Sequence, residues 1–213
     1  MILHLIVALL VGTTVGINAE TRIAVANAVV DNVTIGNTTN ITLVISVTFT
    51  EVEEGLQVTG VIAGLKEGKY GFHVHELGNI ANCSATGAHF NPDDTDHGGR
   101  NHTVRHVGDL GNINVNETGI AYLNFVDKLI TLRGRNNILG RAIVIHEDED
   151  DLGLGDHETS LTTGNAGARL ACVTIGIQSP ADPWNSATTA IPSLTVLFLL
   201  VLLCITQLFD TIH

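Results

Sequence analysis

An alternation of apolar and mostly polar side chains runs through residues 41–50 of this 213-residue chain. The apolar positions are Ile41, Leu43, Ile45, Val47 and Phe49. Because successive side chains of a β-strand point to opposite faces, a period of two predicts a strand with one buried face. A sheet with one apolar face has to bury that face against another layer of structure.

Five further β-rich runs follow the same pattern: Arg22–Val30, Leu56–Leu65, Ala121–Phe125, Ala142–His146 and Ala171–Ile177. Clusters of Gly, Asn, Asp and Glu separate these runs. No amphipathic helix of about 10 residues or more is evident. Short strands at this spacing predict an antiparallel sandwich or barrel.

Two long segments interrupt the strand pattern. Residues 76–111 are rich in His, Asn, Asp and Gly, and residues 147–168 are acidic and rich in Gly and Thr. Each begins directly after a strand that carries histidine. Structureless segments of this length are uncommon in compact domains and usually functional, so we expect two long functional loops.

Both ends of the chain are apolar. Residues 1–19 resemble a signal peptide cut after Ala19 or Gly16, although no Lys or Arg precedes the apolar run. The alternative is an uncleaved N-terminal anchor. Residues 180–193 read as a proline-punctuated stalk, and residues 194–213 as a hydrophobic tail.

The C-terminal tail predicts membrane attachment. The small residues Asn185, Ser186 and Ala187, a short spacer and the terminal apolar run form the pattern of a GPI signal. No Lys or Arg follows the tail, which also favours GPI over a single-pass helix. Either anchor leaves the domain between residues 20 and 179 outside the cell.

Sequons and cysteines agree with that compartment. Six Asn-x-Ser/Thr sequons are glycosylation candidates, at Asn32, Asn37, Asn40, Asn82, Asn101 and Asn116. Cys204 lies in the tail, so Cys83 and Cys172 remain as a pair in the domain. An even pair in a secreted domain favours one disulfide.

Charge excludes one class of partner. The chain carries 10 Lys and Arg against 22 Asp and Glu, a formal net charge of −12. A protein that binds nucleic acid needs a basic surface against phosphate, so we exclude nucleic acid as a partner.

Histidines form the strongest pattern in the domain. His73 and His75 are two apart on a strand, which puts both imidazoles on one face as a chelating pair. His146 ends another strand, and His89, His97, His106 and Asp109 lie in the first long segment. Neutral imidazole suits copper and zinc, and an added carboxylate suits zinc. A lone histidine of this kind would be read as a solvated loop residue.

The strings GFHVHELG, GAHFNP, HGG, RHVGDLGN, IVIHEDEDDLG and TGNAGARLACVTIGI resemble the copper/zinc superoxide dismutase family. Their order and spacing hold from about Arg22 to Gln178. The resemblance implies an eight-stranded antiparallel Greek-key β-barrel, related to the immunoglobulin-like sandwich. It also implies an enzyme that converts superoxide to O₂ and hydrogen peroxide while copper cycles between Cu(II) and Cu(I).

The resemblance assigns roles to individual residues. The implied copper ligands are His73, His75, His89 and His146, and the implied zinc ligands are His89, His97, His106 and Asp109. His89 would bridge the two metals and carry a proton to the product. Arg169 matches the arginine that faces the substrate anion, and Asp150 matches the carboxylate between one copper histidine and one zinc histidine. Cys83 and Cys172 match the family's disulfide.

Two departures from the family bear on rate and assembly. The segment after His146 has no lysine, and Thr162 stands where many members carry one, so electrostatic guidance of superoxide should be weaker. The segment from His75 to Cys83 is one residue shorter than usual, and Asn82 begins a sequon beside the disulfide cysteine. A glycan or a shorter loop there could disfavour the family's homodimer, although we favour an unmodified Asn82.

Two other readings remain open. A silent dismutase-like binding or adhesion module should have lost ligands or the arginine, and both are present here. A copper-delivery protein should expose Cys or Met ligands, whereas the domain has only paired cysteines. His102 and His157 lie outside the ligand pattern and are expected to be solvated, as is the acidic run 147–151, which lacks EF-hand spacing.

Overall fold

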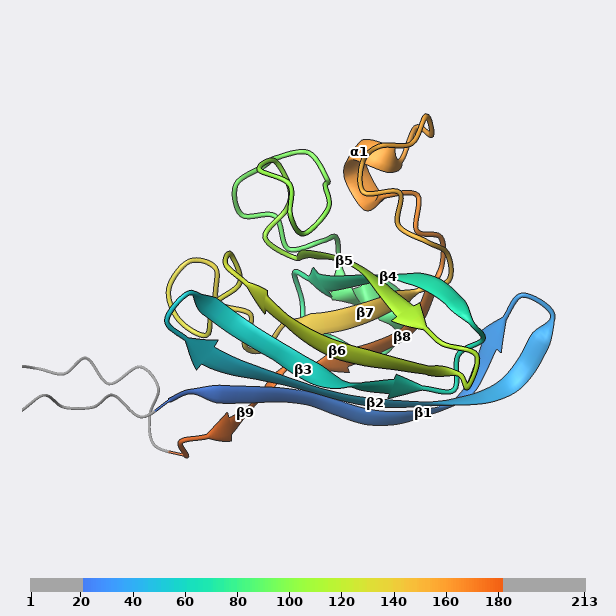
Figure 1. The fold of residues 1–213 in the computed structure, drawn as a ribbon, viewed down its shortest axis with the longest axis horizontal. Coiled ribbons are helices and arrows are strands. Elements are labelled where there is room, and N and C mark those ends of the chain that lie inside the picture. The colour runs from blue at the N-terminus through green and yellow to red at the C-terminus, as the bar shows by residue number, and fades with distance from the viewer. Residues whose placement is uncertain (1–20, 182–213) are drawn as a thin grey trace, which may run out of the picture. The chain divides into compact units, whose positions relative to one another are not determined.

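A computed structural model describes residues 21–181, which form an antiparallel β-sandwich (Figure 1). Within this range a five-stranded sheet has the order β6-β3-β2-β1-β9 and a four-stranded sheet the order β5-β4-β7-β8. The strands are β1 (Ile23–Ile35), β2 (Thr38–Val52), β3 (Gly55–Ala63), β4 (Gly68–His75), β5 (Asp109–Val115), β6 (Ile120–Asp127), β7 (Ala142–His146), β8 (Arg169–Thr174) and β9 (Gly176–Ser179). In the described residues, helix is limited to the 3₁₀ turn η2 (Cys83–Thr86) and the single turn α1 (Ser160–Thr163). The all-β prediction is confirmed.

The described strands number nine rather than eight because the last strand is divided. Only Ile175 separates β8 from β9. β8 pairs with β7 in the smaller sheet, and β9 pairs with β1 in the larger one. Ile175 is buried and exchanges backbone hydrogen bonds with Gly140 and Arg141. The chain therefore passes from one sheet to the other at this residue and joins the two layers, as in a barrel.

The core follows the alternation along β2. Leu43, Ile45, Val47 and Phe49 are buried, whereas the residues between them are exposed or half-buried. Ile41, at the start of the pattern, is half-buried. The first long loop ends earlier than expected, because β5 already begins at Asp109 and pairs with β4.

The outer face of the smaller sheet is buried as well. Every residue of β7 is buried, and so is every residue of β4 from Tyr70 to His75. In a bare two-layer sandwich the outward side chains of such strands would face water. Here the segments 76–108 and 147–168 lie over this sheet (Figure 1), and polar side chains become enclosed between the sheet and the two loops.

The predicted signal peptide, the stalk beyond Ala181 and the apolar tail lie outside the described residues, as does the proposed GPI attachment region. Within residues 21–181, no helix has the length and apolar character needed to cross a membrane.

Candidate metal centre

Strand register gathers the predicted ligands at one end of the smaller sheet. His73 is opposite Asp109 on β5 and Val144 on β7. His75 forms an isolated bridge with His89 of the long loop. His146, the last residue of β7, is opposite Arg169, the first residue of β8. Because paired residues share a face, these side chains enter the same enclosed space.

Four histidines meet in the first cluster. Potential ligand atoms of His73, His75, His89 and His146 all lie within 4.8 Å of one another, and all four residues are buried. The Nε2 atoms of His75 and His146 are 3.3 Å apart. His73 Nδ1 and His89 Nε2 are buried without a hydrogen-bond partner. Four ring nitrogens therefore face one another in this cluster.

Backbone carbonyls identify the protonated nitrogen of two of these rings. His75 Nδ1 lies 2.9 Å from Gly87 O, and His146 Nδ1 lies 3.3 Å from Gly167 O. A carbonyl can only accept, so Nδ1 carries the proton in both neutral rings and Nε2 presents a lone pair to the cluster. This is the tautomer that a metal ligand requires.

The second cluster surrounds the carboxylate of Asp109. Asp109 Oδ1 lies 2.8 Å from His89 Nδ1, 3.1 Å from His106 Nδ1 and 3.0 Å from His97 Nδ1. His97 Nδ1 is off the line that a hydrogen bond needs and has no partner. The other oxygen, Oδ2, accepts from the backbone N–H groups of Gly98 and His106. Three imidazoles and one carboxylate form the donor set of a zinc site.

His89 belongs to both clusters, one through each ring nitrogen. Its Nδ1 faces Asp109 and its Nε2 faces the first cluster. Asp150 makes a second link from the opposite side. Its Oδ2 is 2.9 Å from His73 Nε2, and its Oδ1 is 2.8 Å from His97 Nε2. Carboxylates of this kind orient ligand rings.

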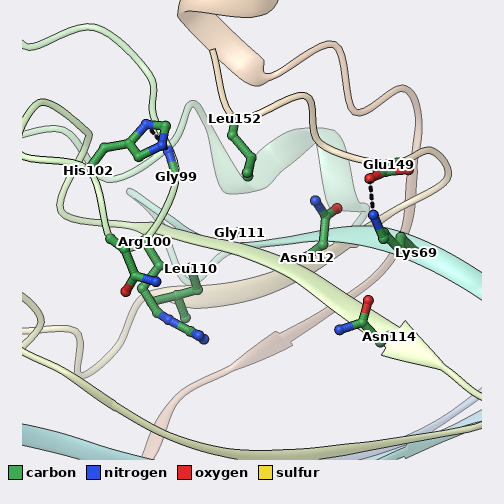
Figure 2. A pocket seen from close by; sticks show the side chains of 11 residues that line it. Lys69, Gly99, Arg100, His102, Leu110, Gly111, Asn112, Asn114, Glu149 and Leu152 are labelled. Carbon is green, nitrogen blue, oxygen red and sulfur yellow. Dashed lines mark hydrogen bonds and ion pairs between the residues drawn. The ribbon is translucent and has the colours of Figure 1, made fainter. Parts of the chain in front are cut away.

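Asn112 holds Asp150 in turn, a role that no pattern in the sequence indicates. Its amide accepts from the backbone N–H of Asp150 and donates to the backbone carbonyl, each at 2.8 Å. Asn112 also lines a pocket of about 310 Å³ that contains no predicted metal ligand (Figure 2). In this pocket Lys69 Nζ is 2.7 Å from Glu149 Oε1. Lys69 is therefore neutralised by an acid of the second loop.

Burial keeps the first cluster uncharged. Desolvation and the nearby His89 ring lower the pKa of His75 to about 2 and the pKa of His146 to about 4. The same two causes hold the pKa of His73 well below its usual range. Burial also lowers the pKa of His89, although Asp109 opposes the shift. Neutral rings are available as ligands at physiological pH.

The carboxylates of the second cluster have the opposite effect. Burial acts to lower the pKa of His97, but the adjacent carboxylates of Asp109 and Asp150 outweigh it and raise that pKa to about 9. Burial acts to raise the pKa of each carboxyl, but hydrogen bonds with histidines hold both pKa values well below the usual range. Metal binding at this cluster must displace the proton of His97.

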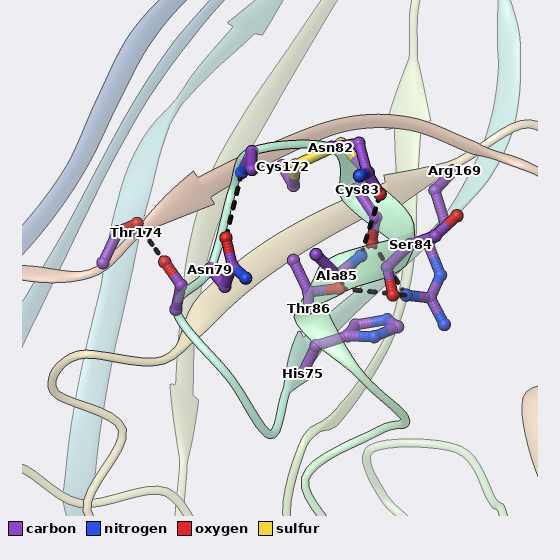
Figure 3. The surroundings of a disulfide bond; sticks show 12 residues. His75, Asn79, Asn82, Cys83, Ser84, Ala85, Thr86, Arg169, Cys172 and Thr174 are labelled. Carbon is purple, nitrogen blue, oxygen red and sulfur yellow. Dashed lines mark hydrogen bonds between the residues drawn. A yellow bond between two sulfur atoms is a disulfide. The ribbon is translucent and has the colours of Figure 1, made fainter.

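Arg169 and the disulfide lie beside the first cluster. Cys83 and Cys172 form a disulfide that closes a separation of 89 residues. Arg169, three residues before Cys172, reaches the η2 turn through its Nη1 atom (Figure 3). Burial lowers the pKa of Arg169, which remains a cation at neutral pH.

The structure therefore brings together every predicted metal ligand, together with Asp150 and Arg169. All six sequon asparagines, Asn32, Asn37, Asn40, Asn82, Asn101 and Asn116, are exposed. The sequence offered no signal for the carbonyls of Gly87 and Gly167 or for Thr86, whose hydroxyl contacts Arg169. Orphaned buried nitrogens and a histidine–carboxylate donor set both fit bound cations.

The fold and this two-part centre define a β-sandwich metalloprotein, and comparison with known proteins identifies its kind. Residues 45–175 match the copper/zinc superoxide dismutase family. The extracellular superoxide dismutase [Cu-Zn] of Drosophila melanogaster is 47% identical over 181 residues, covering 84% of this chain and all of the relative. The crystal structure of the clock protein EA4 is 45% identical with a TM-score of 0.66, covering 73% of this chain and 94% of that one.

The chain belongs to the copper/zinc superoxide dismutase family. It is an oxidoreductase, and its cofactors are copper and zinc.

We expect the metal-free domain to lose stability as the pH falls from about 6.5 to about 4. In the unfolded chain the histidines gain protons near pH 6.5, whereas the folded domain holds the pKa of His146 at about 4 and that of His75 at about 2. The unfolded state binds more protons in this window, so the free energy of unfolding decreases as the pH is lowered. Each unit of difference is worth about 1.4 kcal/mol.

Neither His97 nor the carboxylates offset this loss. With a raised pKa, His97 contributes its full stabilisation below pH 6.5, and the two aspartates lose theirs only below about pH 4. Urea unfolding of chelator-treated protein at pH 7 and pH 5 measures the effect, with metal-loaded protein as the control. An equal or higher midpoint at pH 5 would contradict this reading.

Proposed function

We propose that this enzyme disproportionates superoxide outside the cell, producing O₂ and hydrogen peroxide. His73, His75, His89 and His146 would hold copper, and His89, His97, His106 and Asp109 would hold zinc. The observation that carries this proposal is the pair of clusters that share His89, each with buried nitrogens facing inward. Two superoxide anions and two protons enter each cycle, so the site has to bind an anion and deliver protons.

Copper supplies the one-electron redox chemistry when bound, and zinc supplies fixed charge. His89 directs one ring nitrogen to each cluster. Its Nε2, on the side of the first cluster, is therefore the atom that can hold a proton next to the substrate. Asp109 keeps the opposite nitrogen oriented. Asp150 orients the rings of His73 and His97. It therefore holds the two clusters in a fixed position relative to each other while protons move.

Arg169 would bind the substrate anion. Its backbone is opposite His146 in the register of β7 and β8, and its charge acts on both His75 and His146. Other cations nearby are engaged elsewhere. Arg141 lies over the ring of Phe90 and donates to Glu76 O, and Lys69 pairs with Glu149. Arg169 thus supplies positive charge beside the first cluster of an acidic molecule.

We further propose that the chain is exported and anchored to the cell surface. Residues 1–19 would be the signal peptide, residues 20–179 the catalytic domain, residues 180–193 a stalk with the GPI attachment region, and residues 194–213 the removed tail. The extracellular name of the Drosophila relative supports export. The exposed sequons agree with a glycoprotein.

A homodimer is the assembly we propose. Leu77, Ile80 and Ile177 expose large apolar side chains. The loop that carries Leu77 is held against β8 by a hydrogen bond from Thr174 Oγ1 to Gly78 O. Large exposed apolar side chains are candidates for an interface, which a second copy would cover in this proposal. Asn82 would remain unmodified in this assembly.

The alternative function is a silent binding or adhesion module on the cell surface. A module released from catalysis has no need to keep buried imidazoles neutral or to keep a cation beside them. The intact clusters and Arg169 favour the enzyme.

Metal analysis combined with a superoxide-decay assay tests the proposed function. After loading, we expect about one copper and about one zinc per chain and rapid superoxide decay. His146→Ala should lose copper and retain zinc, and Asp109→Ala should lose zinc. His102→Ala is the matched control, because His102 is exposed and outside both clusters. Less than one copper per chain, or no activity in the loaded protein, would refute the proposal.

We expect the rate to depend only weakly on salt. No Lys or Arg lies between Arg141 and Arg169, a stretch that includes the whole second loop. Raising ionic strength from about 0.02 to about 0.2 M should therefore change kcat/KM by about threefold at most. Thr162→Lys should increase both the low-salt rate and its salt dependence, whereas Ser46→Lys, at an exposed position of β2 in the larger sheet, should do neither. A steep fall for the unmodified protein would contradict this expectation.

Phospholipase treatment tests the anchor. A phosphatidylinositol-specific phospholipase should release the GPI-linked protein from intact cells into the medium. Protein that stays on the membrane after treatment would indicate a transmembrane helix instead.

A further inference from the structure

The guanidinium of Arg169 is held by one of its nitrogens only. Nη1 donates to Cys83 O at 2.8 Å, to Thr86 Oγ1 at 3.0 Å and to Ser84 O at 3.4 Å. Within residues 21–181, neither Nη2 nor Nε makes a hydrogen bond. One edge of the guanidinium is therefore anchored, and the other is available to an anion.

Thr86 supplies one of the two close anchors. Its side chain is fully buried, and its hydroxyl donates to Cys83 O at 2.8 Å. Because a hydroxyl has a single proton and that proton is used on Cys83, Thr86 Oγ1 faces Arg169 as an acceptor. Nη1 has two hydrogens, and its two short contacts are with Cys83 O and Thr86 Oγ1. A β-branched side chain has few rotamers, so this acceptor is fixed in space.

The η2 turn that carries Thr86 is itself rigidly attached (Figure 3). Asn82 caps it by accepting from Ala85 N, and the disulfide joins Cys83 to Cys172 on β8. Leu77 N donates to Thr86 O at 2.9 Å. The next carbonyl along the chain, Gly87 O, orients the ring of His75. One turn thus orients both the cation and a ligand of the first cluster.

We propose that Thr86 is a positioning residue for the anion. Its hydroxyl fixes the rotation of the Arg169 guanidinium, so that the Nη2 and Nε edge faces the substrate beside His75 and His146. Without that hydroxyl the guanidinium can pivot about its bond to Cys83 O, and the free edge turns away from the anion. This inference rests on the role proposed for Arg169 and adds to it the group that directs the arginine.

Azide binding to the copper- and zinc-loaded enzyme is the direct test, because azide is a small anion whose binding changes the visible absorption of copper. Thr86→Val keeps the shape of the side chain and removes the hydroxyl. We expect it to weaken azide binding by about 3- to 10-fold, the size of a typical net hydrogen-bond contribution. KM for superoxide should rise more than kcat falls. Thr86→Ser should restore both values.

Thr174→Val is the matched control. Thr174 also donates its hydroxyl to a loop carbonyl, that of Gly78, in the same region of the molecule, but does not contact Arg169 (Figure 3). We expect Thr174→Val to leave the azide affinity unchanged. If both valine variants weaken azide binding equally, loosening of the loop explains the effect and the inference is wrong.

A double-mutant cycle with Arg169→Gln separates the two proposals. Arg169→Gln should weaken azide binding, and Thr86→Val should have no further effect in that background. Normal azide affinity in Thr86→Val, together with a loss in Arg169→Gln, overturns the role of Thr86 alone. Normal affinity in Arg169→Gln overturns the role of Arg169. If Thr86→Val and Thr86→Ala both fail to load copper, Thr86 is a structural residue and the inference also fails.

Discussion

His75 Nε2 and His146 Nε2 face each other at 3.3 Å, and the unpartnered Nδ1 of His73 and Nε2 of His89 are buried beside them. Four lone pairs that converge in a dry space repel one another and lack the hydrogen bonds that buried polar atoms normally have. A cation removes this cost by accepting all four. The groups around the cluster keep these lone pairs pointing inward. The carbonyls of Gly87 and Gly167 and the carboxylate of Asp150 bind the other ring nitrogens of His75, His146 and His73.

The converging lone pairs depend on the burial of both faces of the smaller sheet. The inner face of the smaller sheet contributes to the apolar core, and the outer face is covered by two long loops. The disulfide attaches the first loop to β8, close to Arg169. The enclosed space therefore combines the neutral imidazoles of the first cluster, the protonated ring of His97 and two ionised carboxylates, with Arg169 beside it, in a molecule of formal net charge −12.

Sequence reasoning predicted the strands and the group of side chains that the structure brings together, but not most of the contacts that hold them. The alternation through β2 and the pair His73 and His75 depend on local periodicity, which a sequence displays directly. The change of sheet at Ile175 depends on tertiary pairing, and so does the early start of β5 at Asp109. Hydrogen bonds between distant residues, such as Asn112 with Asp150 or Thr86 with Arg169, leave no local pattern in the sequence.

The central claim is that two clusters hold different metals and share one imidazole. Anomalous diffraction from crystals of the metal-loaded domain, collected at the copper and zinc absorption edges, tests it most directly. We expect a copper peak contacted by His73 Nδ1, His75 Nε2 and His146 Nε2, and a separate zinc peak contacted by Asp109 and the Nδ1 atoms of His97 and His106. The ring of His89 should lie between the two peaks. A single peak, both elements mixed at one position, or metal bound away from His89 would contradict the account.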